Sequence, residues 1–394
     1  SGGEELERIA RHAAGPLLVL GAAGSGRTEA LVRRAAALRE RGRDPRSLLL
    51  ITRGRASAEL LRRRAERALP GAGDELWVGT YEALAERLLR ERPVEAGLDP
   101  FFATVRPPER LALLLDHLDE LPLRRHEIRG NPAGLLARLL RRIDLLKLER
   151  VDAAALRRWA AEREQLASSA GERERARQEL EFADLYARHD QLLRESGCLD
   201  ELELLVIAER LLRERADVAE DVAARFAHLL IDELEDAAPL HLALLAALDG
   251  GAESVVATCD PAQGVHRLRG AGESGAEWFR ARYPGAGELR LTARRRGGAD
   301  LATALGAVAA PLPGAVQPRG AGEDRVRFWR CESEGAQAQA VAREIERLLA
   351  GGEVAAERVC VIVGSGWREA RLVAAALEER AIPFRYAGDA GFFA

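Results

Sequence analysis

The chain has 394 residues, with 59 Lys+Arg against 63 Asp+Glu, 47% hydrophobic residues and a formal net charge of −4. This length makes two or three domains more expected than one, and the apolar content excludes intrinsic disorder. The balanced charge excludes a basic surface over the whole chain but allows a local one. No apolar run approaches the roughly 20 residues that span a bilayer, so we expect no membrane association.

The cysteines and the first residues bear on the compartment. Cys198, Cys259, Cys331 and Cys360 are scattered and none has CxxC spacing, so we expect neither a disulfide framework nor a zinc site. Residues 1–5 lack the basic start and apolar stretch of a signal peptide. Both features indicate a reducing cytoplasm. The seven histidines form no metal-binding pair such as HExxH, so we expect no structural metal held by the protein.

Short apolar runs alternate with helical segments along most of the chain. The runs predicted to be buried strands are residues 17–20, 48–52, 77–80, 228–231, 255–258, 289–292, 326–329 and 359–363. Periodic segments such as 28–40, 56–68 and 334–349 predict helices between them. This alternation is typical of an α/β fold with a mostly parallel sheet.

The stretch from 91 to 197 has a different texture, with hardly any strand-like run and with Leu, Ala, Arg and Glu at helical spacing. Residues 135–148 and 180–193 predict amphipathic helices, and residues 167–177 predict an exposed loop. The stretch is therefore interpreted as an all-helical insertion between two strands. A second boundary is expected near 311–323, which is rich in Pro and Gly.

A glycine-rich segment follows the first predicted strand and opens the first long helix. It consists of Gly21, Ala22, Ala23, Gly24, Ser25, Gly26, Arg27 and Thr28. The pattern is GxxxxGKT with arginine at the lysine position. Its glycines let backbone N–H groups surround a phosphate chain, and the helix N-terminus favours an anion. The segment predicts a nucleotide-binding loop with Thr28 as a Mg²⁺ ligand; the alternative is an ordinary Gly-rich turn.

Arg27 is the departure within this loop. A guanidinium is wider and flatter than the usual ammonium, so the exchange is not conservative. We expect phosphate binding to persist and the catalytic geometry to change. Lys147 is the only lysine in the chain, and this general replacement of lysine by arginine, typical of GC-rich codon usage, offers a simple origin for Arg27.

A second buried strand runs directly into acidic residues, from Asp232 to Asp236. Asp232 is predicted to hold Mg²⁺, and Glu233 is predicted to activate the attacking water. The alternative is a strand that leads into an acidic, N-capped helix. The phosphate-binding loop upstream favours the first interpretation.

The order of these motifs resembles the UvrD/PcrA/Rep helicases of superfamily 1, over nearly the whole chain. The further segments that carry the resemblance are residues 50–60, 78–85, 259–271, 291–296, 381–388 and 391–393. Residues 259–271, which resemble GDPDQSIYxFRGA, and the last two segments, which resemble GIPYxxxGGxxFF, are the most specific.

The resemblance implies a RecA-like ATP-binding domain of residues 1–90 and 198–288, a helical insertion of residues 91–197, and the incomplete beginning of a second RecA-like domain in residues 289–394. It implies ATP and Mg²⁺ as cofactors. It also implies movement along single-stranded DNA, or at a junction with duplex, in repair or recombination in a bacterial cytoplasm, alongside other repair proteins.

The resemblance further implies roles for individual residues. Gln263 would couple the γ-phosphate to the DNA, and Arg296 would stabilise phosphate charge as an arginine finger, beside Asp232 and Glu233. The alternative for residues 294–296 is a solvated basic turn. The residues implied to line the DNA groove are Thr52, Arg53, Arg55, Thr80, Tyr81, His266, Arg267 and Arg269. Such contacts make binding sensitive to salt and tolerant of sequence.

The chain also departs from the family pattern at several positions. Arg27 and Glu235 stand where the family has Lys and Gln. The other departures are Cys259, Ala262, His266, Leu268 and Gly364, together with the lack of any glutamine before Gln165 that could read adenine. Nothing in the chain resembles motifs V and VI.

Two compatible explanations follow from these departures. The chain is expected to be the N-terminal part of a longer helicase, or a diverged paralogue that acts as a DNA-binding or scaffold subunit. Either way we expect weak or absent ATP hydrolysis by the 394 residues alone. A third class, a P-loop kinase of a small molecule, is disfavoured by residues 259–271 and 291–296.

Overall fold

The computed structural model describes residues 2–72, 75–126, 130–264, 275–312, 316, 324–364 and 368–386. The chain divides into two compact units, residues 1–325 and 326–394. No helix in the described ranges is long and apolar enough to cross a membrane.

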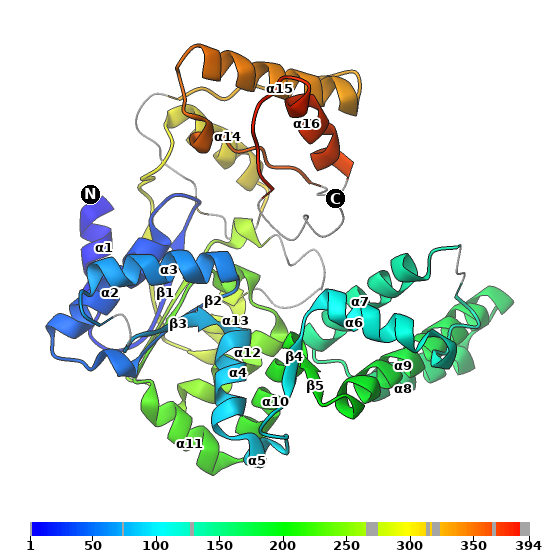
Figure 1. Ribbon diagram of the computed structural model, residues 1–394. Coiled ribbons are helices and arrows are strands. Elements are labelled where there is room, and N and C mark those ends of the chain that lie inside the picture. The colour runs from blue at the N-terminus through cyan, green and yellow to red at the C-terminus, as the bar shows by residue number, and fades with distance from the viewer. Residues whose placement is uncertain are drawn as a thin grey trace. The chain divides into compact units, whose positions relative to one another are not determined.

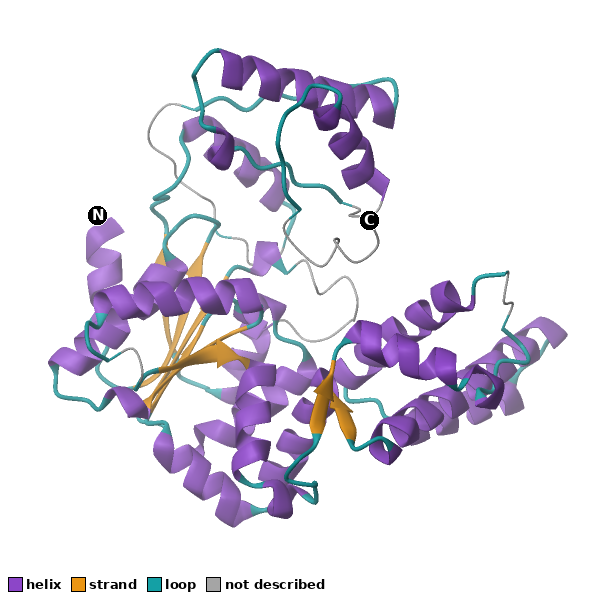
Figure 2. Ribbon diagram, viewed as in Figure 1, coloured by secondary structure: helices purple, strands orange, loops and turns teal. Residues whose placement is uncertain are grey.

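A six-stranded parallel sheet forms the centre of the first unit (Figures 1 and 2). In spatial order its strands are β3 (Trp77–Thr80), β2 (Leu48–Thr52), β6 (His228–Ile231), β7 (Ser254–Cys259), β1 (Gly15–Gly21) and β8 (Gly287–Leu291). The first six predicted strands are thereby confirmed, and the fold is RecA-like α/β. β7 pairs with both β1 and β6 in parallel register, so the carboxyl ends of these three strands lie at one edge.

Helices cover both faces of the sheet because strand side chains of both orientations are apolar. On β1, Leu17 and Val19 belong to one core and Leu18 and Leu20 to the other. The first core is closed by α1 (Gly2–Ala10), α2 (Arg27–Glu40) and α3 (Arg55–Ala68). The second is closed by α4 (Tyr81–Glu91), α10 (Glu201–Glu214), α11 (Ala216–Arg225), α12 (Pro239–Leu248) and α13 (Gly275–Arg282).

The helical insertion, drawn from cyan to green in Figure 1, has a hydrophobic core of its own. It consists of α6 (Pro107–Asp116), α7 (Pro132–Leu148), α8 (Ala153–Leu166) and α9 (Ala170–Glu195). After α5 (Pro93–Ala96), the chain enters it through β4 (Ala103–Val105) and leaves through β5 (Cys198–Asp200), which pair in parallel. The sequence did not predict this ribbon, because three-residue strands carry too few residues for a recognisable pattern.

The exposed loop predicted over residues 167–177 was wrong, because α9 already begins at Ala170. Ser169 and Glu172 form a capping box: the Ser169 hydroxyl accepts from the Glu172 N–H, and the Glu172 carboxylate accepts from the Ser169 N–H. These reciprocal bonds satisfy backbone donors that the first turn would otherwise leave open. The polar cluster is therefore a helix start rather than a loop.

The strands predicted at 326–329 and 359–363 are also not found. Neither segment pairs with another strand within the described part of the second unit, and a strand exists only through such a ladder. The side chains of Phe328 and Ile362 are about nine-tenths exposed, at 87% and 91%. This unit is instead held by α15 (Glu334–Ala350) and α16 (Arg368–Glu378), which share a small core. β8 and α14 (Ala299–Ala309) belong to the first unit, which thus extends past residue 288.

A buried charge cluster ties the insertion to the remainder of the first unit. Lys147, on α7, is 2% exposed, and its Nζ lies 3.1 Å from Asp190, 2.9 Å from Asp200 and 2.7 Å from Glu203. Asp190 lies on α9 in the insertion, whereas Asp200 ends β5 and Glu203 lies on α10, which packs on α4 and α12. One ammonium group therefore bridges two subdomains.

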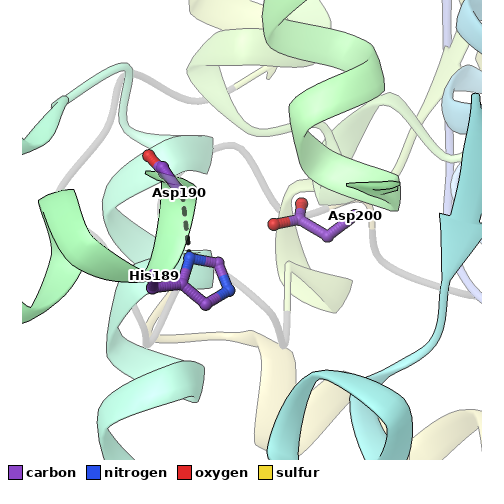
Figure 3. Close-up of side chains that lie close together, drawn as sticks. All are labelled: His189, Asp190 and Asp200. Atoms are coloured by element: carbon purple, nitrogen blue, oxygen red, sulfur yellow. Dashed lines mark hydrogen bonds and ion pairs between the residues drawn. The ribbon is translucent and has the colours of Figure 1, made fainter. Parts of the chain in front are cut away.

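Part of this cluster has the composition of a metal site. His189, Asp190 and Asp200 form the one group among the described residues with ligand atoms close enough for a metal ion (Figure 3). Lys147 contacts both carboxylates, so a cation is already supplied by the chain. Burial alone would lower the pKa of Lys147, but the surrounding carboxylates more than offset this and raise it. Three donors on a compact ammonium suit three converging carboxylates better than a planar guanidinium does, which gives the only lysine a structural reason.

Replacing Lys147 with Met keeps much of the side-chain volume but leaves three carboxylates without their shared cation. We expect the free energy of unfolding to fall by about 3–5 kcal/mol, measured by urea denaturation. Arg157→Ala, which breaks an exposed ion pair with Asp184, is the matched control and should have little effect. Unchanged stability in the Lys147 variant would contradict this assignment.

Candidate nucleotide-binding site

The phosphate-binding loop has the backbone that its sequence requires. Gly24 and Gly26 have φ values of 78° and 100°, in the left-handed region that favours glycine. Gly26 is the N-cap of α2 and provides no side-chain cap, so the first-turn N–H groups are left for another partner. An added Cβ on Gly26 would lie 2.9 Å from Arg295 Cδ. A narrow loop with uncapped donors at a helix N-terminus is a cradle for an anion.

The two predicted Mg²⁺ ligands meet beside this loop. Thr28 Oγ1 donates a hydrogen bond of 2.7 Å to one oxygen of Asp232, and Thr258 Oγ1 donates one of 2.5 Å to the other. Asp232 is 3% exposed. A hydroxyl and a carboxylate are the oxygen donors that Mg²⁺ prefers, so these residues fit the ion. Thr258, near the end of β7, was not singled out in the sequence; its signal is a polar residue at the end of an apolar strand.

Glu233 is held in an uncommon backbone conformation. Its φ of 57° and ψ of 44° lie in the left-handed region, which non-glycine residues rarely adopt. Thr52 Oγ1 donates to one carboxylate oxygen at 2.9 Å, and Ser57 Oγ donates to the other at 3.1 Å. The carboxylate is therefore oriented by two hydroxyls from β2 and α3. Sequence analysis missed Ser57 because a serine at a helix start is ordinarily a local cap.

Arg27, at the end of the loop, faces the acidic strand rather than open solvent. Its guanidinium forms an ion pair with Glu235, on the short 3₁₀ helix η3 (Leu234–Asp236), and donates a hydrogen bond of 3.2 Å to Gln263 Oε1. Gln263 lies on η5 (Pro261–Gln263), and its Nε2 donates to Asp260 at 2.8 Å. These contacts join the segments that follow β1, β6 and β7.

The predicted arginine finger lies at the mouth of the same site. Arg295 N donates to the Gly24 carbonyl at 2.8 Å, which holds this segment against the phosphate-binding loop. Arg296 is exposed and lines a cavity of about 770 Å³ with residues of the loop, α2 and α3. Arginines dominate the polar lining, and Val32, Ala36 and Leu60 add apolar surface. The cavity offers both charge and an apolar wall beside the loop.

Comparison with known proteins identifies the family. The family model described as UvrD/REP helicase N-terminal domain matches residues 3–284. The chain belongs to this helicase family.

Three relatives illustrate the likeness. DNA helicase II of Escherichia coli (strain K12) is 26% identical over 388 residues, which cover 96% of this chain and 50% of the relative. ATP-dependent DNA helicase UvrD1 of Mycobacterium leprae (strain TN) is 27% identical over 407 residues, covering 97% and 49%. ATP-dependent DNA helicase PcrA of Bacillus subtilis (strain 168) is 22% identical over 384 residues, covering 96% and 49%. The chain thus spans about half the length of these curated relatives.

The residues implied to bind DNA fall into two groups in the helicase fold. Thr52 is fully buried and donates to Glu233, and Thr80 is 6% exposed and caps α4. Tyr81 is 1% exposed and packs on the His241 ring at 4.6 Å. These three side chains are buried against their own elements and neighbours, and their part in DNA binding stays a prediction.

The remaining DNA-binding candidates are arginines and one histidine. Arg53 is partly exposed and pairs with Glu82 at 3.2 Å, and Arg55 is largely exposed and pairs with Glu201. Arg53 directly follows β2, and Arg55 is the first residue of α3. The other three, His266, Arg267 and Arg269, lie outside the described residues.

Glu82, which pairs with Arg53, makes the stability of the folded state depend on pH. Burial by itself would raise the Glu82 pKa, but the neighbouring His241 and Arg53 lower it to about 2 from an ordinary value of 4.5. A carboxyl with a depressed pKa stabilises the folded state above pH 4.5, and this contribution is lost as pH falls toward 2.

The stability difference between the wild type and Glu82→Gln should therefore shrink with acid. We expect a difference of up to roughly 3 kcal/mol at neutral pH, from the size of the pKa shift, and a progressively smaller one below pH 4.5. Chemical denaturation at a series of pH values measures both quantities. A difference that stays constant from neutral pH to about pH 3 would rule out this role.

Proposed function

We propose that this chain is the N-terminal portion of an ATP-dependent DNA helicase or translocase that binds Mg–ATP and single-stranded DNA. One observation carries the proposal. Asp232 and Glu233 converge with Thr28 beside a single phosphate-binding loop, although Thr28 lies 204 residues before Asp232 in the sequence. Family membership supports the same activity, since the relatives are named as DNA helicases.

The residues divide the work of ATP hydrolysis among them. The loop's backbone N–H groups and Arg27 bind the phosphates, and Thr28 and Asp232 would hold Mg²⁺, which would neutralise phosphate charge. Glu233, oriented by two hydroxyls, accepts a proton from the attacking water. Arg296, at the mouth of the cavity, stabilises charge on the phosphates. Gln263, in contact with Arg27, senses the phosphates and links them to the DNA-binding segment that follows it.

We propose further that residues 289–394 contain the beginning of the second RecA-like lobe. Residues 326–394 form a compact unit of their own, in which α15 and α16 share a small core, and this supports a second lobe. The partner class is single-stranded DNA or its junction with duplex, with repair or recombination as the setting.

A second candidate function is a catalytically impaired paralogue that acts as a DNA-binding or scaffold subunit. The ion pair between Arg27 and Glu235 favours it, because the loop's cation is engaged by a carboxylate. Arg27→Lys in the full-length protein distinguishes the two. A large gain in ATPase rate indicates a decayed motor, whereas no gain indicates a site adapted to another use.

Nucleotide binding is tested with a fluorescent ATP analogue and the 394-residue chain. The wild type should bind more tightly with Mg²⁺ than without it. Asp232→Asn should lower the affinity roughly tenfold or more when Mg²⁺ is present, and should leave it unchanged when Mg²⁺ is absent. Asp221→Asn, on α11 and 52% exposed, is the control and should behave as the wild type. Equal binding by the wild type with and without Mg²⁺ would count against the proposed site.

DNA binding is tested with a fluorescent single-stranded oligonucleotide at several salt concentrations. Arg55→Ala should weaken binding severalfold for all sequences and reduce the slope of log affinity against log salt by about 1. Arg225→Ala, which removes another exposed arginine, on α11, is the control. Identical salt slopes for the Arg55 variant and the wild type would exclude Arg55 from the DNA track.

A further inference from the structure

Arg27, the cation of the phosphate-binding loop, is already paired with other residues of the chain. The Arg27 side chain is 12% exposed and that of Glu235 is 3% exposed, and the two form an ion pair. The second Arg27 nitrogen donates to Gln263 Oε1. Both ends of the guanidinium fork are therefore directed at acceptors on η3 and η5.

The acceptor side of this pair is rigidly held. The second Glu235 oxygen accepts a hydrogen bond of 3.1 Å from the Asp260 backbone N–H, and Asp260 in turn accepts from Gln263 Nε2. Asp260 is 2% exposed. Glu235, on η3 after β6, is thus also hydrogen-bonded to the segment that follows β7.

A polyphosphate and Glu235 compete for the same positive charge. A phosphate chain in the loop would be stabilised by Arg27, but the carboxylate neutralises that guanidinium and adds a negative charge of its own nearby. We propose that Glu235 is an internal competitor of the nucleotide phosphates, and that nucleotide binds by displacing Arg27 from Glu235. This rests on the proposed nucleotide-binding function and adds a residue that sets the affinity of the site.

The environment of Glu235 is consistent with a pair that can open. Burial raises the pKa of Glu235 to about 7, although Arg27 and the backbone of Asp260 act against it. The ion pair therefore only partly offsets the cost of burying the charged carboxylate. A ligand that offers Arg27 a more highly charged partner can replace it.

The test is a double-mutant cycle on the affinity for a fluorescent ATP analogue, with the 394-residue chain. Glu235→Gln should tighten binding roughly tenfold, the value of one charge-assisted hydrogen bond released to the ligand. In an Arg27→Ala background the same change at Glu235 should bring no gain. Glu209→Gln, a similarly buried glutamate paired with Arg150, is the matched control and should leave affinity unchanged.

Each of the other outcomes leads to a different conclusion. Wild-type binding with no gain in Glu235→Gln overturns the competition but leaves the proposed function intact. A gain that persists without Arg27 also overturns it, because removal of negative charge would then suffice. Absence of binding in every variant at millimolar nucleotide overturns both the inference and the proposed function. Far-UV circular dichroism checks folding, and Glu235→Ala replaces the Gln variant if the latter does not fold.

Discussion

The position of β7 between β1 and β6 is the constraint on which the site depends. The three strands are parallel and in register, so the segments that follow them emerge side by side at one edge of the sheet. The phosphate-binding loop, the acidic segment after Asp232 and the segment after Cys259 become neighbours there. Thr258 shows the effect directly, since its hydroxyl reaches Asp232 across the β6–β7 pairing.

This geometry links two of the departures from the helicase pattern. Arg27 and Glu235 are 208 residues apart in the chain but form one ion pair, and Gln263 completes it. A longer, planar cation at the end of the loop needs an acceptor deeper in the site, and a glutamate supplies it with charge. The two substitutions therefore act together, and the effect of either one on nucleotide affinity depends on the other.

Lys147, the only lysine, illustrates the opposite case, in which the surrounding side chains rather than the overall composition account for the residue type. Almost every cation of this chain is arginine, yet Lys147, which is 2% exposed, remains where three carboxylates converge. A flat guanidinium cannot direct donors to all three, whereas a tetrahedral ammonium can. The insertion is thus joined to α10 by a buried ammonium group.

The sequence by itself determined the six parallel strands, the long helices, the phosphate-binding loop and the acidic strand, because periodicity and local motifs encode these features over short distances. It could not reveal the β4–β5 ribbon, the start of α9 or the absence of ladders at residues 326–329, because these depend on pairing partners and on single capping bonds. Only the tertiary structure decided which polar residues meet. Thr52 and Tyr81 are buried, two hydroxyls donate hydrogen bonds to Glu233, and Arg27 pairs with Glu235. The reason is that strand order, rather than distance along the chain, determines which side chains become neighbours.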